Sequence, residues 1–222
     1  METERVAHDA RRLTAIVDRI TEHLTTKNEV RDLTLGRSRA LIRYCANSIR
    51  AAHRHEYDEA RALLAEAREA AAVMKADAAA YPDVYFAGYL QDALKELAEA
   101  AIVLAIITGQ PLPDPDDLGI EYAAYLNGLG EAMGEMRRYV LDSLRRDDLA
   151  AAEGLLDVMD DVYSHLVTID FPDSLTGGLR RTTDMVRGVT ERTRGDLTTT
   201  YRQERLQEAL QALEAKLECR AE

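Results

Sequence analysis

The spacing of proline along the chain is the feature that most limits its fold. The sequence of 222 residues holds only five prolines, and none of them lies within the first 81 residues. A proline inside a helix costs about 3 kcal/mol, so long proline-free stretches are typical of long helices. Apolar residues recur at intervals of three and four along these stretches, as they do at Leu206, Leu210, Leu213 and Leu217. The pattern predicts an all-α fold without β-strands.

Turn signals indicate about seven helices joined by short links. Pro82 is expected to open a helix, and the proline-rich stretch Gly109–Gly119 is predicted to be a loop. The expected helices cover residues 2–24, 28–52, 58–79, 82–108, 120–144, 149–167 and 174–219. The last of these is one helix or two, because Gly177-Gly178 and the threonines at 198–200 are candidate breaks. We predict a single helical domain over residues 1–222.

Two apolar stripes are expected to pack on neighbouring helices. The inner face of the first helix is predicted to comprise Val6, Leu13, Val17 and Ile20. The four leucines between residues 206 and 217 form a seam near the end of the chain. This leucine seam is either an ordinary core stripe or a surface that packs on a helix of the same chain or of another copy.

Charge, cysteine content and hydropathy limit the class of protein. The formal net charge of −12 argues against nonspecific binding to nucleic acid, although a local basic surface is compatible with it. Cys45 and Cys219 lie far apart and form no CxxC motif, so we expect two free thiols, with Cys45 in the core. The N-terminus lacks an apolar leader, and the apolar run Ala100–Ile107 is far shorter than the roughly 20 residues of a membrane helix. These features predict a soluble cytoplasmic protein with no membrane partner.

Two acidic segments are the strongest candidates for chemistry. Glu96 and Glu99 lie three residues apart just before the apolar run, so they share one helix face. Glu131 and Glu135 lie four residues apart and share a face of a later helix. Crowded carboxylates repel one another and burial raises their pKa values, but a divalent cation that prefers oxygen ligands removes the penalty. The spacing predicts a site for Mg²⁺, or for Mn²⁺, if the two helices face each other.

The same glutamates also have a simpler interpretation as partners in surface ion pairs. Lys95 lies four residues before Glu99, and Arg138 lies three residues after Glu135. A ferritin-like di-iron site is not expected. Such bundles use Glu-x-x-His, and none of the five histidines has an acidic residue three positions before it.

Arginine supplies nearly all of the positive charge, and it is clustered. The planar guanidinium group suits contacts to the RNA backbone, although solvated faces that balance an acidic chain are an alternative explanation. His53 and His55 flank one of these arginines and are expected at the surface or facing phosphate. The candidate nucleic-acid-binding residues are Arg39, Arg43, Arg50, Arg54, Arg180 and Arg181.

Four segments follow one another in an order that is familiar from a known family. They are Ser38-Arg39 with the closing pair His53-Arg54, Glu96 to Ala100, Tyr125 to Glu135, and Phe171 through Leu197. Together they resemble the translin and translin-associated factor X family, and the last segment is similar to its prokaryotic, archaeal-type members. The resemblance spans nearly the whole chain.

The resemblance implies an α-α superhelical subunit of seven helices that assembles into a closed homo-oligomer, an octamer, around RNA or single-stranded DNA. For the factor X branch it implies an endoribonuclease that uses Mg²⁺, with Glu96, Glu99 and Glu131 as catalytic acids and Glu135 as a fourth metal ligand. Glu131 stands where factor X has aspartate, and Phe86-Ala87 stands where relatives have Phe-His. In such a site the ion activates a water and polarises the phosphoryl oxygen, so no histidine is required. The alternative is a non-catalytic binder of single-stranded RNA or DNA.

Overall fold

The chain folds entirely into helices, as the sequence predicts. The computed structural model describes the backbone of residues 2–221 and the side chains of residues 9–217, and it contains no strand within them. Three of the helices, α3, α5 and α8, are single turns. In order the helices are α1 Glu2–His53, α2 Tyr57–Ala78, α3 Pro82–Tyr85, α4 Gly88–Ile107, α5 Pro115–Leu118, α6 Tyr122–Leu144, α7 Leu149–Leu166, α8 Asp173–Thr176 and α9 Leu179–Ala221.

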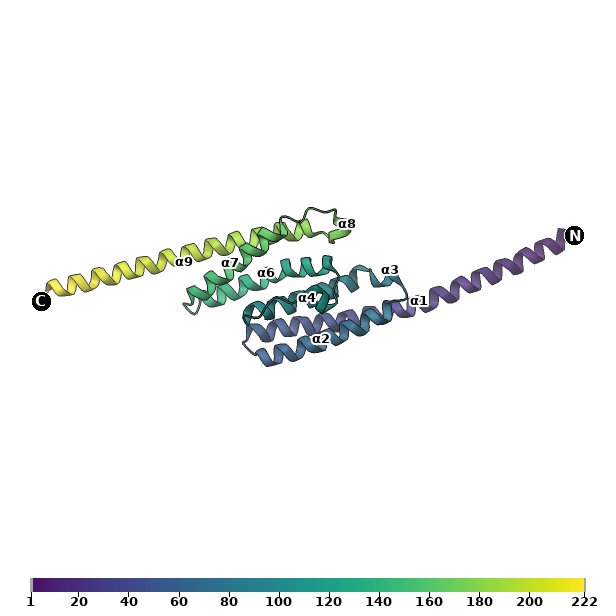
Figure 1. The fold of residues 1–222 in the computed structure, drawn as a ribbon, viewed down its shortest axis with the longest axis horizontal. Coiled ribbons are helices and arrows are strands. Elements are labelled where there is room, and N and C mark those ends of the chain that lie inside the picture. Colours follow the sequence, from purple (N-terminus) through teal and green to yellow (C-terminus); the bar gives the residue numbers. More distant parts are fainter. Residues whose placement is uncertain (1, 222) are drawn as a thin grey trace.

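The long helices lie side by side in one elongated bundle. The α1–α2 pair forms one side, α4 and α6 follow, and α7 with α9 forms the opposite side (Figure 1). The N-terminal part of α1 and the C-terminal part of α9 extend beyond the bundle in opposite directions (Figure 1). The two acidic segments of the sequence therefore lie on adjacent helices in the middle of the bundle.

The apolar character of α4 explains its central position. Every residue from Leu97 to Ala105 is buried, and α4 contacts α1, α2 and α6. A helix that is apolar on all sides must be covered on all sides. Cys45 on α1 is fully buried against this core, as predicted. Glu99 lies inside the buried stretch of α4, so the core carries an ionisable group.

One helix replaces the first two that the sequence predicts. Residues 25–27 continue α1 without a break, and the hydroxyls of Thr25 and Thr26 donate to the carbonyls of Thr21 and Glu22. Threonine side chains satisfied in this way are tolerated inside a helix, and no proline or glycine lies in this segment to end it. The turn predicted near residues 53–57 is present between α1 and α2.

The segment after Pro82 is divided differently from the prediction. The helix that Pro82 opens stops after one turn at Tyr85, and the extended backbone of Ala87, with ψ of 143°, separates it from α4. The predicted loop after Gly109 also contains the single turn α5. These short turns lie at the end of the bundle where α4 and α6 begin.

Of the two candidate breaks near the C-terminus, one is present. Gly177 and Gly178 separate α8 from α9 and have φ of 61° and 85°, a conformation that glycine adopts without steric cost. The threonines at 198–200 do not interrupt α9, because each hydroxyl bonds to the carbonyl four residues earlier.

The two predicted apolar stripes lie on the projecting ends of α1 and α9. The leucine seam stays 52–61% exposed, so it is not a core stripe of this chain. The predicted inner face of the first helix is wrong for the same reason: its described members, Leu13, Val17 and Ile20, are 49–62% exposed. Val6 lies outside the residues whose side chains are described. A helix that projects beyond the bundle has no neighbour in its own chain to cover it.

Candidate metal centre

The close approach of α4 and α6 depends on Gly128. A Cβ atom at this position would lie 2.6 Å from the carbonyl oxygen of Lys95 and 2.8 Å from the Cβ of Ala98. Both distances are far inside van der Waals contact, so only glycine permits this separation of the two helices. Glu131, one turn later on α6, is consequently brought beside the acidic face of α4.

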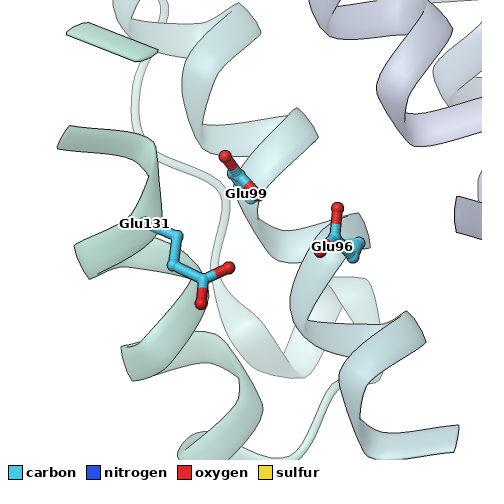
Figure 2. A group of neighbouring side chains, drawn as sticks. All are labelled: Glu96, Glu99 and Glu131. Atoms are coloured by element: carbon cyan, nitrogen blue, oxygen red, sulfur yellow. The ribbon is translucent and has the colours of Figure 1, made fainter. Parts of the chain in front are cut away.

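Three of the four predicted acids converge at this crossing. Glu96, Glu99 and Glu131 each offer one carboxylate oxygen, and these oxygens all lie within 4.8 Å of one another. Glu131 reaches from α6 toward the two side chains on α4 (Figure 2). Glu99 is buried, and the other two are partly buried. We call these three residues the acidic centre.

Burial and mutual repulsion strain the ionised form of the acidic centre. Burial raises the pKa of Glu99 to about 8, and the charges of Glu96, Glu131 and Glu135 add to the effect. The pKa of Glu96 is also raised, chiefly by burial. Hard divalent cations such as Mg²⁺ and Mn²⁺ take sets of oxygen ligands of this kind. The donor atoms and their charge therefore fit such an ion.

Lys95 provides a single positive charge at the edge of the acidic centre. Its ammonium nitrogen lies 2.8 Å from Oε1 of Glu131, so it pairs across the two helices rather than along α4 with Glu99. Burial alone would lower the pKa of Lys95, but the hydrogen bond and charge of Glu131 outweigh it and the pKa is raised. One ammonium group neutralises only one of the three carboxylates.

Glu135 lies one turn beyond Glu131 and is held by a different partner. Nε2 of His53 lies 2.5 Å from Oε2 of Glu135, and Arg138 lies 3.9 Å from the same oxygen. The hydrogen bond from His53 lowers the pKa of Glu135 despite its burial. The sequence indicated that His53 and His55 lie at the surface or face phosphate. His55 is exposed, whereas the side chain of His53 is only 4% exposed, so a position at the surface is wrong for His53. The structure thus places Glu135 next to the acidic centre but outside the group of three.

Replacing Gly128 by alanine tests whether the helix crossing positions the acidic centre. The added methyl group meets two backbone atoms and a Cβ atom, so α4 and α6 must separate. Overpacking of this kind typically costs about 1–3 kcal/mol, and we expect a loss of that size in chemical denaturation. Gly134→Ala is the matched control, because a Cβ at Gly134 meets nothing within 4 Å and alanine favours the helix. Equal effects of the two substitutions would contradict this account.

The predicted arginines on α1 lie on the side of the helix that faces solvent. Arg39, Arg43, Arg50 and Arg54 are all exposed. At about 100° per residue they lie about 120° to 180° around α1 from Cys45, on whose thiol the charges of Glu96 and Glu99 act, so they are directed away from the acidic centre. Arg50 donates to Asn47 and Arg54 pairs with Glu56. Arg39 and Arg43 make no ion pair with any residue that the structure describes.

The second arginine pair lies at the start of α9. Arg180 is 3.7 Å from Asp170 across the turn that precedes the helix. Arg181 lines a cavity whose wall also includes Lys95 and Glu131. The structure therefore brings Arg181 to the neighbourhood of the acidic centre, whereas Arg180 is engaged with the preceding loop.

Sequence reasoning missed a cluster of polar rings at the turn between α1 and α2. His55, which has φ of 62°, approaches the hydroxyl of Tyr57 at 2.7 Å and that of Tyr139 at 3.3 Å. Arg146 approaches the other ring nitrogen of His55 at 2.8 Å. No spacing in the sequence links residues 55 and 139, so only the folded chain reveals this contact.

Comparisons with known proteins place these features in context. The chain is 32% identical over 197 residues to the uncharacterized protein MJ0175 of Methanocaldococcus jannaschii, covering 88% of this chain and 87% of the relative. It is similar to AfC3PO, known from a crystal structure and from a complex with duplex RNA, with TM-score 0.78 and 34% identity over 83% of this chain and 96% of that one. Apo-NeC3PO, at TM-score 0.76 and 21% identity with the same coverage, shares the fold. No family model matches the chain.

The fold and the acidic centre define an all-α bundle with a carboxylate-rich site between two central helices. With these relatives, the chain belongs to the translin family, of which the C3PO proteins are members. The resemblance indicated by its motifs is thereby confirmed. Within residues 2–221, no helix combines the length and the apolar character needed to span a membrane.

Proposed function

We propose that this protein is a Mg²⁺-dependent endoribonuclease whose acidic centre, Glu96, Glu99 and Glu131, holds the ion, with Glu135 as a fourth acid beside it. The single observation that carries the proposal is the meeting of three carboxylates, one of them buried, between two helices. Among the residues that the structure describes, only Lys95 forms an ion pair with any of the three. A divalent cation would supply the positive charge that balances the group.

The residues of the centre suit phosphodiester hydrolysis. A bound divalent cation lowers the pKa of a coordinated water and polarises the phosphoryl oxygen. The three carboxylates fix the position of that charge, and His53 keeps Glu135 ionised beside it. Lys95 presents a further cation at the edge of the centre, where the phosphate of a substrate would approach.

RNA as the substrate is supported by a relative and by the arginines. AfC3PO, 34% identical to this chain, is solved in complex with duplex RNA. The exposed arginines on α1 offer guanidinium groups for phosphate oxygens. Contacts to the backbone carry no sequence information directly, so we expect weak sequence preference and binding of single-stranded RNA or DNA as well.

Removing two of these arginines should weaken RNA binding. In the double variant Arg39→Ala/Arg43→Ala we expect a lower affinity for RNA. The slope of log Kd against log salt concentration should also fall, by about 1.4–1.8 for two lost phosphate contacts. Fluorescence anisotropy over a salt series measures both quantities. Arg61→Ala, exposed on α2 and paired with Asp58, is the control and should leave the slope unchanged. An unchanged slope in the double variant would place the RNA elsewhere.

The direct test of the proposed activity uses the full-length protein. We expect single-stranded or duplex RNA to be cut with Mg²⁺ or Mn²⁺ and to remain intact with chelator. Internal cleavage is distinguished from trimming by labelling each end of the RNA in turn. Cleavage that persists in chelator would show that a metal ion at the acidic centre is not responsible for it.

A non-catalytic RNA-binding protein is the second candidate, and Lys95 favours it. The ammonium group already neutralises one carboxylate of the centre, and the raised pKa of Glu99, about 8, allows that residue to be uncharged at neutral pH. The centre is therefore tolerable without an ion. RNA binding without cleavage in any divalent cation would select this candidate.

Assembly into a homo-oligomer, for which we propose an octamer, is supported by the projecting helix ends. Both carry apolar side chains that stay 52–62% exposed, among them Leu13, Leu24 and the leucine seam. Exposed apolar stripes on helices are typical of contacts with another helix. Light scattering after size exclusion measures the mass that would decide between an octamer and a smaller assembly.

A further inference from the structure

A large cavity extends away from the acidic centre. Its volume is about 1010 Å³, and its wall is formed by the first halves of α4 and α6 together with α8 and the start of α9. Lys95 and Glu131 lie at one end of this wall, and Phe86 and Tyr122 lie at the other. Since Tyr122 and Glu131 are nine residues apart on α6, the two ends are separated by roughly 14 Å. The cavity is long enough to receive a segment of substrate that begins at the acidic centre.

Two cationic side chains line the cavity near the acidic centre. Lys95 is paired with Glu131 there, and Arg181 enters from α9 without an ion pair among the residues described. Arginine and lysine in this arrangement suit an anion such as a phosphate group. A phosphodiester attached to one held at the acidic centre would lie between these two cations.

The far end of the cavity carries two exposed aromatic rings. Phe86 is 64% exposed and Tyr122 is 63% exposed, although both rings line the cavity. The ring of Phe86 is braced by that of Tyr85, with centroids 5.0 Å apart in an edge-to-face arrangement. Exposed aromatic rings beside cations are the features on which proteins stack unpaired bases. The family resemblance drew attention to Phe86-Ala87, but nothing in the sequence distinguished Tyr122 from ordinary surface residues.

Glu121 helps to hold the ring of Tyr85 behind Phe86. Tyr85 donates its hydroxyl proton to Oε1 of Glu121, while Oε2 of Glu121 is buried and has no hydrogen-bond partner among the residues described. Because Tyr85 packs edge-to-face on Phe86, this contact helps to fix the exposed ring of Phe86 at the cavity.

We propose that this cavity binds the unpaired nucleotides that adjoin the scissile phosphate, with a base stacked at Phe86 and Tyr122 and the phosphate between Lys95 and Arg181. The proposal rests on the proposed function for the identity of the substrate, but it concerns binding and not cleavage. It makes the protein selective for RNA with a single-stranded end or gap over fully paired RNA.

The test measures binding in chelator, so that cleavage plays no part. The probes are a short RNA duplex with an unpaired tail and the same duplex with blunt ends. We expect Phe86→Ala/Tyr122→Ala to lower the affinity for tailed RNA by about ten- to a hundred-fold and to leave the blunt duplex unaffected. Phe171→Ala is the matched control, because Phe171 is also 64% exposed but does not line the cavity.

The possible results separate this proposal from the proposed function. Equal affinity of the wild-type protein for tailed and blunt RNA, or an unchanged affinity in the double variant, would overturn the cavity proposal even if Mg²⁺-dependent cleavage is observed. A change of oligomeric mass in the double variant without a change in tail preference would also overturn it, since a second copy would then occupy the cavity. Tail preference that is lost in the double variant, in a protein that cleaves no RNA, would support the cavity and reject the nuclease.

Discussion

The Glu99→Gln variant should lose metal-dependent RNA cleavage by at least about a hundred-fold. Glutamine keeps the size of the side chain but removes the charge, and charge stabilisation through a metal ion contributes several kcal/mol to such reactions. Glu99 is the buried member of the acidic centre, within 4.8 Å of the oxygens of the other two.

This loss should not arise from unfolding. The substitution removes the carboxyl group whose ionised form burial and neighbouring charges oppose, so the metal-free variant should be at least as stable as the wild-type protein at pH 8. Chemical denaturation in chelator checks this directly. Glu153→Gln, on the exposed side of α7, is the matched control and should cleave normally. If Glu99→Gln cleaved RNA at the wild-type rate, the acidic centre would not be the site of the reaction.

The metal-free protein should become less stable as pH rises from about 4.5 to about 8. The pKa of Glu99 is raised by burial from 4.5 to about 8 in the folded state, so within this window the folded chain binds more protons than the unfolded chain. Linkage then requires the free energy of unfolding to fall with increasing pH. At about 1.36 kcal/mol for each unit of pKa, the loss amounts to a few kcal/mol. It is complete above the pKa of the folded state.

Added Mg²⁺ should reverse the loss at pH 8 or above, because an ion that binds only the folded centre stabilises it. Denaturation at pH 5.5 and pH 8.5, each with Mg²⁺ or with chelator, gives the four values needed. In Glu99→Gln the dependence on pH should flatten. Glu135 contributes with the opposite sign, since its pKa is lowered by His53 and its stabilisation is lost only on acidification below the pKa of the unfolded state. Equal stability of the protein at the two pH values in chelator would contradict the raised pKa of Glu99 in the folded state.

Much of the fold could be predicted from local sequence rules, and the errors of that prediction have causes that can be named. Proline, paired glycines and apolar periodicity predicted the all-α class and most boundaries. One boundary error lies at residues 25–27, which continue α1 because the hydroxyls of Thr25 and Thr26 are satisfied inside the helix. Another lies after Tyr85, where the extended backbone of Ala87 separates α3 from α4. The predicted inner face of the first helix failed for another reason. Periodicity identifies an apolar face but not whether the same chain covers it.

Residue spacing in the sequence predicts some features of the candidate site but not others. Spacing placed Glu96 and Glu99 on one face of α4, because residues three apart always share a helix face. It could not show that Glu135 turns to His53, 82 residues earlier, nor that Lys95 pairs with Glu131, 36 residues away. These choices depend on how helices distant in the sequence are aligned.

The amino-acid sequence by itself determined the helices, their apolar and acidic faces and the family, because each depends on interactions within a few turns or on motifs in order. Only the tertiary structure decided that α4 and α6 cross at Gly128, that three carboxylates therefore meet, and that a cavity opens beside them toward Phe86 and Tyr122. The physical reason is that a crossing depends on atoms of both helices at once. Gly128 is required only because the backbone of α4 packs directly against it, and the sequence of α6 alone does not show this contact.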